Sequence, residues 1–305
     1  MTAHRFRLAA GALLLPLALA AAAFAVPPAG AEDGGLPRFE FYVRGSLTAA
    51  GTGATYENSY DPHPGYAVPG SYARQTLQVN PLSGSGLQAG LTVFFNRTIG
   101  IRLSVGRDEN PFRGVNSTFD MSYKYTVWMP TLTGFQFVDG IRTTSTEWPD
   151  TSGALRRTAI GLEAVVRLPL GRALSLNLFA GPLLSFFDGD IHSLAYSELV
   201  YERYGAFFFD TYFVRLRLPA QAALGFTGGA ELSLRLDRHL ALVLGAACRS
   251  GSYSGPPQIM SAFDYNTVLE APATVMDRIK AQIAPRPITV TPSPFVFGAG
   301  FSLAF

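Results

Sequence analysis

The sequence has little charge and no long hydrophobic run after its N-terminal segment. Only 15% of its 305 residues are charged, against about 25% in ordinary soluble domains. Hydrophobic residues make up 48% of the chain. So little charge beside so many apolar residues indicates that apolar side chains face something other than water.

Lysine and cysteine are almost absent. Of the 24 basic residues only Lys124 and Lys280 are lysines, and the rest are arginines. The basic residues form no run, and 22 acidic residues balance their charge. A nucleic acid partner is therefore not expected. Cys248 is the one cysteine and cannot form an internal disulfide. With 31 glycines and 21 prolines the chain is also not a coiled coil.

The N-terminal segment has the pattern of a secretory signal peptide. Arg5 and Arg7 precede an apolar run, residues 8–24, and the small residues of Ala29–Ala31 follow. We expect residues 1–31 to be the signal peptide, with a second possible cleavage site after Ala25, and residues 32–305 to be the mature domain. The longest later apolar run, residues 240–248, is too short for a membrane-spanning helix but suits a strand.

The mature chain has hydrophobic residues at every second position in eight segments. This period places alternate side chains on opposite faces of a strand. The segments cover residues 39–47, 87–96, 99–105, 160–168, 174–180, 224–234, 240–246 and 295–305.

The connections between these strands are short and long in alternation. Tight turns near residues 97–98, 169–172 and 237–239 alternate with long connections at roughly 50–84, 107–155, 188–220 and 251–291. A membrane barrel has this pattern, with short periplasmic turns and long outer loops. The sequence therefore predicts an all-β fold: an eight-stranded antiparallel up-and-down transmembrane barrel with four long outer loops. We expect it in the bacterial outer membrane, among its lipids and lipopolysaccharide, with both termini in the periplasm.

The two faces of the strands distinguish this barrel from a soluble one. One face is nearly continuous Leu, Val, Ile and Phe, as lipid contact requires, whereas a soluble barrel needs charge outside. The other face carries the charged residues that we expect in a narrow lumen, either as a structural plug of ion pairs or as a gate that opens for a solute. These are Glu40, Arg44, Arg102, Glu163, Arg167, Glu231 and Arg235.

The last strand ends in an aromatic residue. Phe297, Phe301, Leu303 and Phe305 lie on one face of it. An ending of this kind is typical of the signal read by the outer-membrane assembly machinery, which would add the strand to an exposed sheet edge.

Several strand segments together carry a family resemblance. They are Phe41–Gly45, Gly86–Phe94, Asn96–Arg102, Leu178–Pro182, Phe186–Asp188 and Pro294–Phe301. These segments resemble eight-stranded outer-membrane proteins of the OmpW type. The resemblance implies a narrow hydrophobic channel that admits small apolar molecules and releases them sideways into the membrane. The alternative is a structural or adhesive surface barrel with a plugged lumen and no transport.

The expected outer loops are rich in aromatic residues. These suit either an interfacial belt and strand extensions or a surface that binds a small apolar ligand. For the ligand surface we single out Trp128, Phe207, Phe208, Phe209, Tyr212 and Phe213. In the last loop, residues 274–283 form an amphipathic pattern that predicts a short helix over the barrel mouth.

One short motif suggests hydrolysis. Asp188, Asp190 and His192 resemble the Asp-x-His pairing of the omptin proteases, in which such groups activate a water. A second acidic pair, which those proteases have, is not found. The sequence therefore predicts a protein that is not an enzyme, with no cofactor and no metal site.

Overall fold

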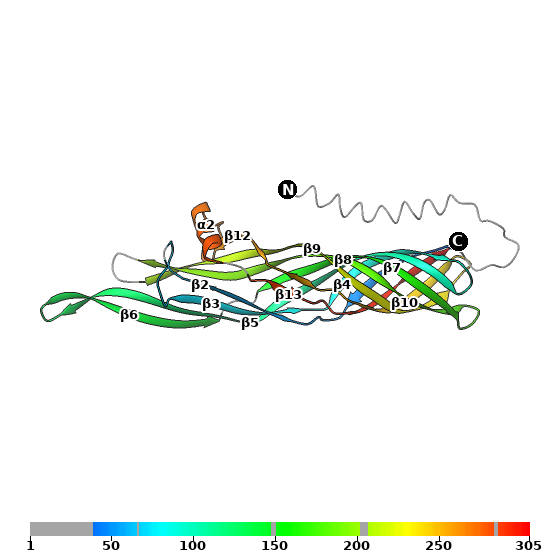
Figure 1. Ribbon diagram of the computed structural model, residues 1–305, viewed down its shortest axis with the longest axis horizontal. Coiled ribbons are helices and arrows are strands. Elements are labelled where there is room, and N and C mark those ends of the chain that lie inside the picture. The colour runs from blue at the N-terminus through cyan, green and yellow to red at the C-terminus, as the bar shows by residue number, and fades with distance from the viewer. Residues whose placement is uncertain (1–38, 66, 148–150, 202–206, 284–285) are drawn as a thin grey trace.

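Eight strands of the computed structural model close into an antiparallel barrel (Figure 1). The structure describes residues 39–65, 67–147, 151–201, 207–283 and 286–305; the expected signal peptide lies outside them. Each strand hydrogen-bonds to the next and the last to the first, so the wall has no open edge, as a membrane requires. In order around the barrel the strands are β1 (Phe39–Thr48), β4 (Gly84–Phe94), β5 (Ile99–Thr131), β7 (Ser152–Pro169), β8 (Leu174–Tyr201), β9 (Phe207–Arg235), β10 (Leu240–Arg249) and β14 (Phe295–Ala304).

Side chains alternate between lumen and outer surface along the wall. On β7, Glu163 and Val165 are buried, whereas Ile160 and Leu162 are exposed. The exposed residues of the eight strands form an apolar belt of the kind that faces lipid. It includes Val43, Leu87, Ile101, Leu103, Ile160, Leu162, Leu178, Leu224, Phe226, Leu244, Phe297 and Phe301. In the described part of the chain, no helix combines the length and hydrophobicity needed to cross a membrane.

The predicted fold class and all eight predicted strands are confirmed. Tight turns at residues 95–98, 170–173 and 236–239 join neighbouring strands at one end of the barrel. Phe305 lies there too, since its backbone pairs with Phe39. We call this end the turn end and the opposite end the loop end.

The four long connections are present, but they contain much regular structure: most of residues 107–155 and 188–220 is strand, and the other two connections contain shorter strands and, in the last, a helix. β5 has 33 residues and is roughly 110 Å long at about 3.3 Å per residue. A strand needs only about ten residues to cross a membrane, so most of β5 extends beyond it. Further strands are added to these extended parts: β3 (Tyr72–Pro81) and β6 (Gly134–Glu147) pair with β5, β12 (Gln258–Asp264) pairs with β9, and β2 (Ala54–Tyr60) pairs with β3. β11 (Tyr253–Gly255) pairs with β13 (Ile288–Val290).

The loop-end sheet encloses a hydrophobic core of its own. The predicted amphipathic segment forms helix α2 (Ala273–Gln282), whose Val275 and Ile279 are buried in this core. Figure 1 shows α2 beside β12, and the ribbon of β5 and β6 as the part furthest from the turn end. Other core members are Tyr56, Leu77, Phe112, Tyr123, Leu155, Phe187, Ile191, Tyr196, Leu199, Leu216, Leu218 and Tyr253.

Candidate functional site

The centre of the lumen holds an arginine between two glutamates. Arg102 of β5 hydrogen-bonds through Nη1 to Glu231 of β9, and the same nitrogen lies 3.6 Å from Oε2 of Glu163 on β7. Ser104 donates a hydrogen bond of 2.9 Å to the other oxygen of Glu163. Each of these three charged side chains is 2–3% exposed, so they compensate one another rather than interacting with bulk water.

A second arginine, two strands away from Arg102 in the wall, reaches the same carboxylate. Arg44 of β1 places Nη1 3.4 Å from Oε2 of Glu231 and donates from Nε and Nη2 to Gln88 at 3.0 and 2.7 Å. The guanidinium carbons of Arg44 and Arg102 lie 5.4 and 4.8 Å from the centre of the Tyr42 ring. The two guanidinium groups thus share the carboxylate of Glu231 and the ring of Tyr42.

A further charged layer lies toward the loop end, and sequence reasoning missed it. Oδ2 of Asp108 accepts from Arg157 at 3.0 Å and from Arg249 at 2.9 Å, and Oδ1 accepts from Ser46 at 3.0 Å. These residues continue the lumen-facing alternation of β5, β7, β10 and β1. Extending the period of two beyond the apolar segments would have found them.

The layer at the turn end is a mouth lined by arginines. Arg167 pairs with Glu40, donates to Asn177 at 3.1 Å and lies over the Phe94 ring at 3.9 Å. Arg235 was predicted in the lumen, but it is exposed at the rim, because β9 ends at this residue and the chain turns. A cavity of about 440 Å³ opens there, and its lining includes Glu40, Arg97, Arg167, Arg172, Arg235 and Arg238.

Glycines make the room that these large lumen side chains occupy. A Cβ at Gly245 would lie 2.8 Å from Nη1 of Arg44 and 2.8 Å from Cγ of Glu231. At Gly90 it would lie 2.5 Å from the Tyr42 ring. The small residues of the lumen face therefore do not widen a pore; they accommodate the ion-pair network.

The aromatic residues predicted for a ligand surface lie in different places. Tyr212 is only 4% exposed, which corrects its prediction as a surface residue: it belongs to the loop-end core. Phe209 packs partly against that core, edge to face with Tyr123, and Phe213 contacts Tyr265. The side chains of Trp128, Phe207 and Phe208 lie outside the described residues.

Polar contacts join the elements of the loop-end core. The Tyr60 hydroxyl accepts from the Ser197 amide at 2.7 Å and donates to its carbonyl at 3.1 Å, and burial raises the pKa of Tyr60 well above its ordinary value. Arg278 of α2 donates to Glu198 of β8 at 2.7 Å, which raises the pKa of Arg278. The helix is thus tied to the sheet by charge as well as by its apolar face.

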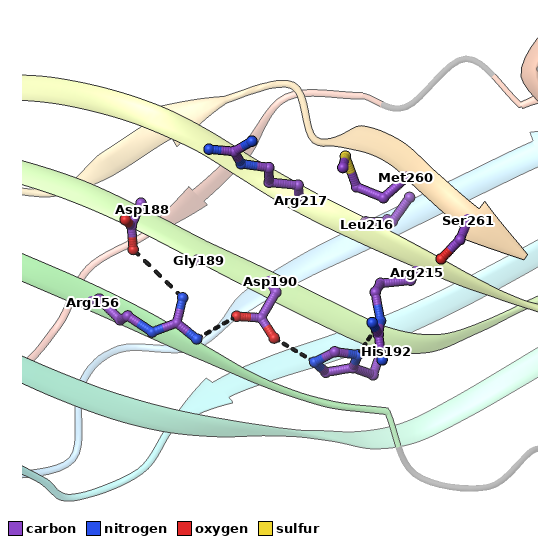
Figure 2. Close-up of a pocket in the computed structure, with 10 residues that line it drawn as sticks. All are labelled: Arg156, Asp188, Gly189, Asp190, His192, Arg215, Leu216, Arg217, Met260 and Ser261. Carbon is purple, nitrogen blue, oxygen red and sulfur yellow. Dashed lines mark hydrogen bonds and ion pairs between the residues drawn. The ribbon is translucent and has the colours of Figure 1, made fainter. Parts of the chain in front are cut away.

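A charged cluster lies on the outer face of the wall, immediately beyond the apolar belt (Figure 2). Arg156 of β7 donates to Asp190 of β8 at 2.8 Å and lies 3.6 Å from Asp188. His192 contacts the other oxygen of Asp190 and accepts from Arg215 of β9 at 3.0 Å. Asp188, Asp190 and His192 alternate with buried Gly189 and Ile191 and so point away from the lumen.

The residues predicted as an assembly signal lie on the outer face of the last strand. Phe297, Phe301 and Leu303 of β14 are exposed, and Phe305 follows at the turn end. Cys248 of the neighbouring β10 is exposed on the same surface. Among the described residues, no group of three or more His, Cys, Asp or Glu is placed to hold a metal ion.

No protein-family model and no curated protein matches this chain. Several solved structures are similar to it, and three of them are outer-membrane proteins with the following measures. The outer membrane protein OprG from Pseudomonas aeruginosa is 16% identical over 90% of this chain and 99% of that one, with a TM-score of 0.40. The outer membrane protease OmpT from Escherichia coli is 8% identical over 87% and 97%, with a TM-score of 0.40. Ail, the attachment invasion locus protein of Yersinia pestis, is 10% identical over 87% and 99%, with a TM-score of 0.28.

One expectation is corrected by these comparisons. The prediction that the chain is not an enzyme is wrong as an exclusion, because one similar solved structure, OmpT, is a protease. Identities and scores of this size give this chain neither an activity nor a ligand. Its own strand order, closure and lipid-facing belt make it a small eight-stranded outer-membrane β-barrel protein.

Proposed function

We propose that this protein is a non-conducting surface barrel that presents its loop-end sheet outside the cell. The observation that carries the proposal is that ion pairs in the lumen join strands that are not neighbours in the wall. Arg102 of β5 reaches Glu231 of β9, and Arg249 of β10 reaches Asp108 of β5. Contacts of this kind cross the lumen and fill it, which an eight-stranded barrel is just narrow enough to allow.

A path for apolar solutes through this lumen is unfavourable. A solute would have to separate buried guanidinium and carboxylate groups, and leaving one such charge unpaired costs about 3–5 kcal/mol. It would then have to displace the loop-end core beneath α2. The geometry therefore favours the plugged surface barrel over the hydrophobic channel implied by the OmpW resemblance.

The connection lengths support an orientation with the turn end in the periplasm. Outer-membrane barrels keep short turns inside and project long segments outward. The three tight turns share the turn end with Phe305, while β5 and β6 project furthest at the loop end. In this orientation the last strand is also available to the assembly machinery on the periplasmic side.

Cysteine labelling on intact cells tests the orientation. In a Cys248→Ser background, Thr133→Cys at the exposed tip of the β5–β6 ribbon should react with a membrane-impermeant maleimide. Arg172→Cys, exposed in a turn at the other end, is the matched control and should react only after the cells are lysed. Labelling of Arg172→Cys on intact cells would contradict the orientation.

A flux assay tests the closed lumen. Vesicles that contain the protein should release entrapped sucrose, and take up an apolar fluorescent probe, at the rates of vesicles without protein. Faster passage of either solute would contradict a non-conducting barrel.

A second candidate function is capture of an amphiphile by the ribbon of β5 and β6. It is favoured by apolar side chains exposed there, among them Met129, Leu132 and Ile141 at 47, 108 and 66%. The test is binding of an apolar probe to wild type and to a Leu132→Ser, Ile141→Ser variant. Equal binding by the two proteins would remove this candidate.

A further inference from the structure

The charged cluster on the outer wall encloses a pocket where the apolar belt ends. The pocket has a volume of about 400 Å³, and its lining includes Arg156, Asp188, Asp190, His192, Arg215 and Arg217. On the turn-end side of it, the outward residues of β7 are apolar or small from Ile160 to Leu168. The pocket therefore lies at the depth where lipid headgroups meet the acyl chains of one leaflet.

The two arginines of β9 have donors to spare, whereas the third does not. Arg156 is engaged by Glu109, Asp188 and Asp190, so its single positive charge is shared among three carboxylates. Among the described residues, Arg215 donates one hydrogen bond, from Nε to His192, and its guanidinium carbon lies 6.0 Å from the centre of the Phe263 ring, which leaves its two Nη groups without an acceptor. Within the described part of the chain, the guanidinium of Arg217 has no hydrogen bond or ion pair, and Figure 2 shows it at the side of the pocket away from His192.

Exposed apolar residues continue from these arginines along β8 and β9. Ala220 and Ala222 face outward with little bulk, the first of them about 10 Å from Arg217 at 3.3 Å per residue. Phe186 of β8 lies opposite Ala222 in the register, and beyond it Leu224 is 83% exposed. One surface thus offers guanidinium donors and, on their turn-end side, an apolar strip that a chain of methylene groups can contact.

We propose that this surface binds one phosphorylated lipid of the outer leaflet, with a phosphate on Arg215 and Arg217 and an acyl chain along Ala222 and Leu224. Guanidinium donors recognise phosphate oxygens in pairs. The proposal rests on the outward orientation of the loop end. In the outer leaflet of this membrane, the phosphate-bearing lipid is the lipid A part of lipopolysaccharide.

Binding to the full-length mature protein in detergent tests the proposal without requiring orientation or conduction. The probes are lipid A with its phosphates, the same lipid without phosphates, and inorganic phosphate. The variant is Arg215→Gln with Arg217→Gln. The matched control is Arg235→Gln with Arg238→Gln, which removes the same charge at the turn end. All proteins are first checked for the heat-dependent migration of a folded barrel.

We expect the Arg215, Arg217 variant to bind lipid A about tenfold more weakly than wild type and the control to bind it unchanged. Lipid A without phosphates should bind wild type about as weakly as the variant binds lipid A. Equal lipid A affinity in wild type and variant would overturn the site. Displacement of lipid A by an equal concentration of inorganic phosphate would overturn the lipid assignment, since it would show a simple anion site.

Should the Arg215, Arg217 variant fail to fold, Leu224→Ser tests the acyl-chain half of the same site. It should weaken binding of lipid A and leave the folded barrel intact, because Leu224 is exposed on the outer wall. Unchanged affinity in Leu224→Ser would contradict the proposal. If the barrel conducts and these differences in lipid A binding are still found, the proposed non-conducting function is wrong and the lipid site stands.

Discussion

Replacing Glu231 by glutamine should destabilise the barrel strongly, because this one carboxylate compensates two buried arginines. Glu231 is 2% exposed and is paired with Arg102 and with Arg44. Glutamine keeps the volume and one acceptor oxygen, so the change removes little more than the charge. The lumen holds Arg44, Arg102, Arg157, Arg167 and Arg249 against Glu40, Asp108, Glu163 and Glu231, so the net charge of 5 − 4 = +1 becomes 5 − 3 = +2.

The size of the effect follows from what each arginine keeps. Removing one partner of a buried ion pair costs about 3–5 kcal/mol. Arg102 still has Glu163 at 3.6 Å, and Arg44 still has Gln88 at 2.7 Å. We therefore expect the free energy of unfolding to fall by the lower figure, about 3 kcal/mol.

The assay is urea unfolding of vesicle-inserted protein, followed by the circular dichroism of the sheet. Glu57→Gln is the matched control, since Glu57 is 50% exposed and its pair with Arg286 at 3.4 Å is exposed as well. Such a pair contributes about 0–1 kcal/mol. If Glu231→Gln and Glu57→Gln unfold at the same urea concentration, the lumen pairs are not the dry, compensating network described above.

Four further changes have defined outcomes. Deleting Phe305, or replacing it with Asp, should lower the amount of folded protein in the outer membrane, measured by heat-dependent migration; a native level would argue against the terminal signal. Gly245→Ala should cost about 1–3 kcal/mol in the urea assay because the lumen beside it is full, whereas Gly171→Ala, with nothing within 4 Å, should cost much less; equal costs would contradict the filled lumen. Cys248 should react with a membrane-soluble maleimide and not with a charged one; reaction with the charged reagent alone would show that the Cys248 side chain does not face lipid and that the register of β10 is wrong. Because burial raises the pKa of Tyr60, its contribution to stability is present below about pH 10 and is lost as pH rises further; Tyr60→Phe should reduce that loss, seen by near-ultraviolet circular dichroism.

The wall of the barrel could be predicted because lipid imposes a simple rule on it. Each strand that crosses the membrane must show apolar residues outward at every second position, and this pattern is local in the sequence. The same rule placed Arg44, Arg102, Glu163 and Glu231 on the lumen face, where the structure has them buried.

The loop end could not be predicted in the same way. Above the membrane the outer face meets water or other strands, so the alternation that marks a strand fades although backbone pairing continues. Asp108, Arg157 and Arg249 were missed because they lie just beyond the last apolar residues of their strands. The contact of Tyr60 with Ser197 joins segments 137 residues apart, and no local pattern specifies it.

The most direct test of the closed lumen is the ionic current through single wild-type molecules inserted into a planar lipid bilayer. We predict no discrete conductance steps above the bare membrane, because ion pairs cross the lumen and the core beneath α2 covers its loop end. Regular steps from properly folded protein would contradict this prediction and would show that the charged network opens to form a channel.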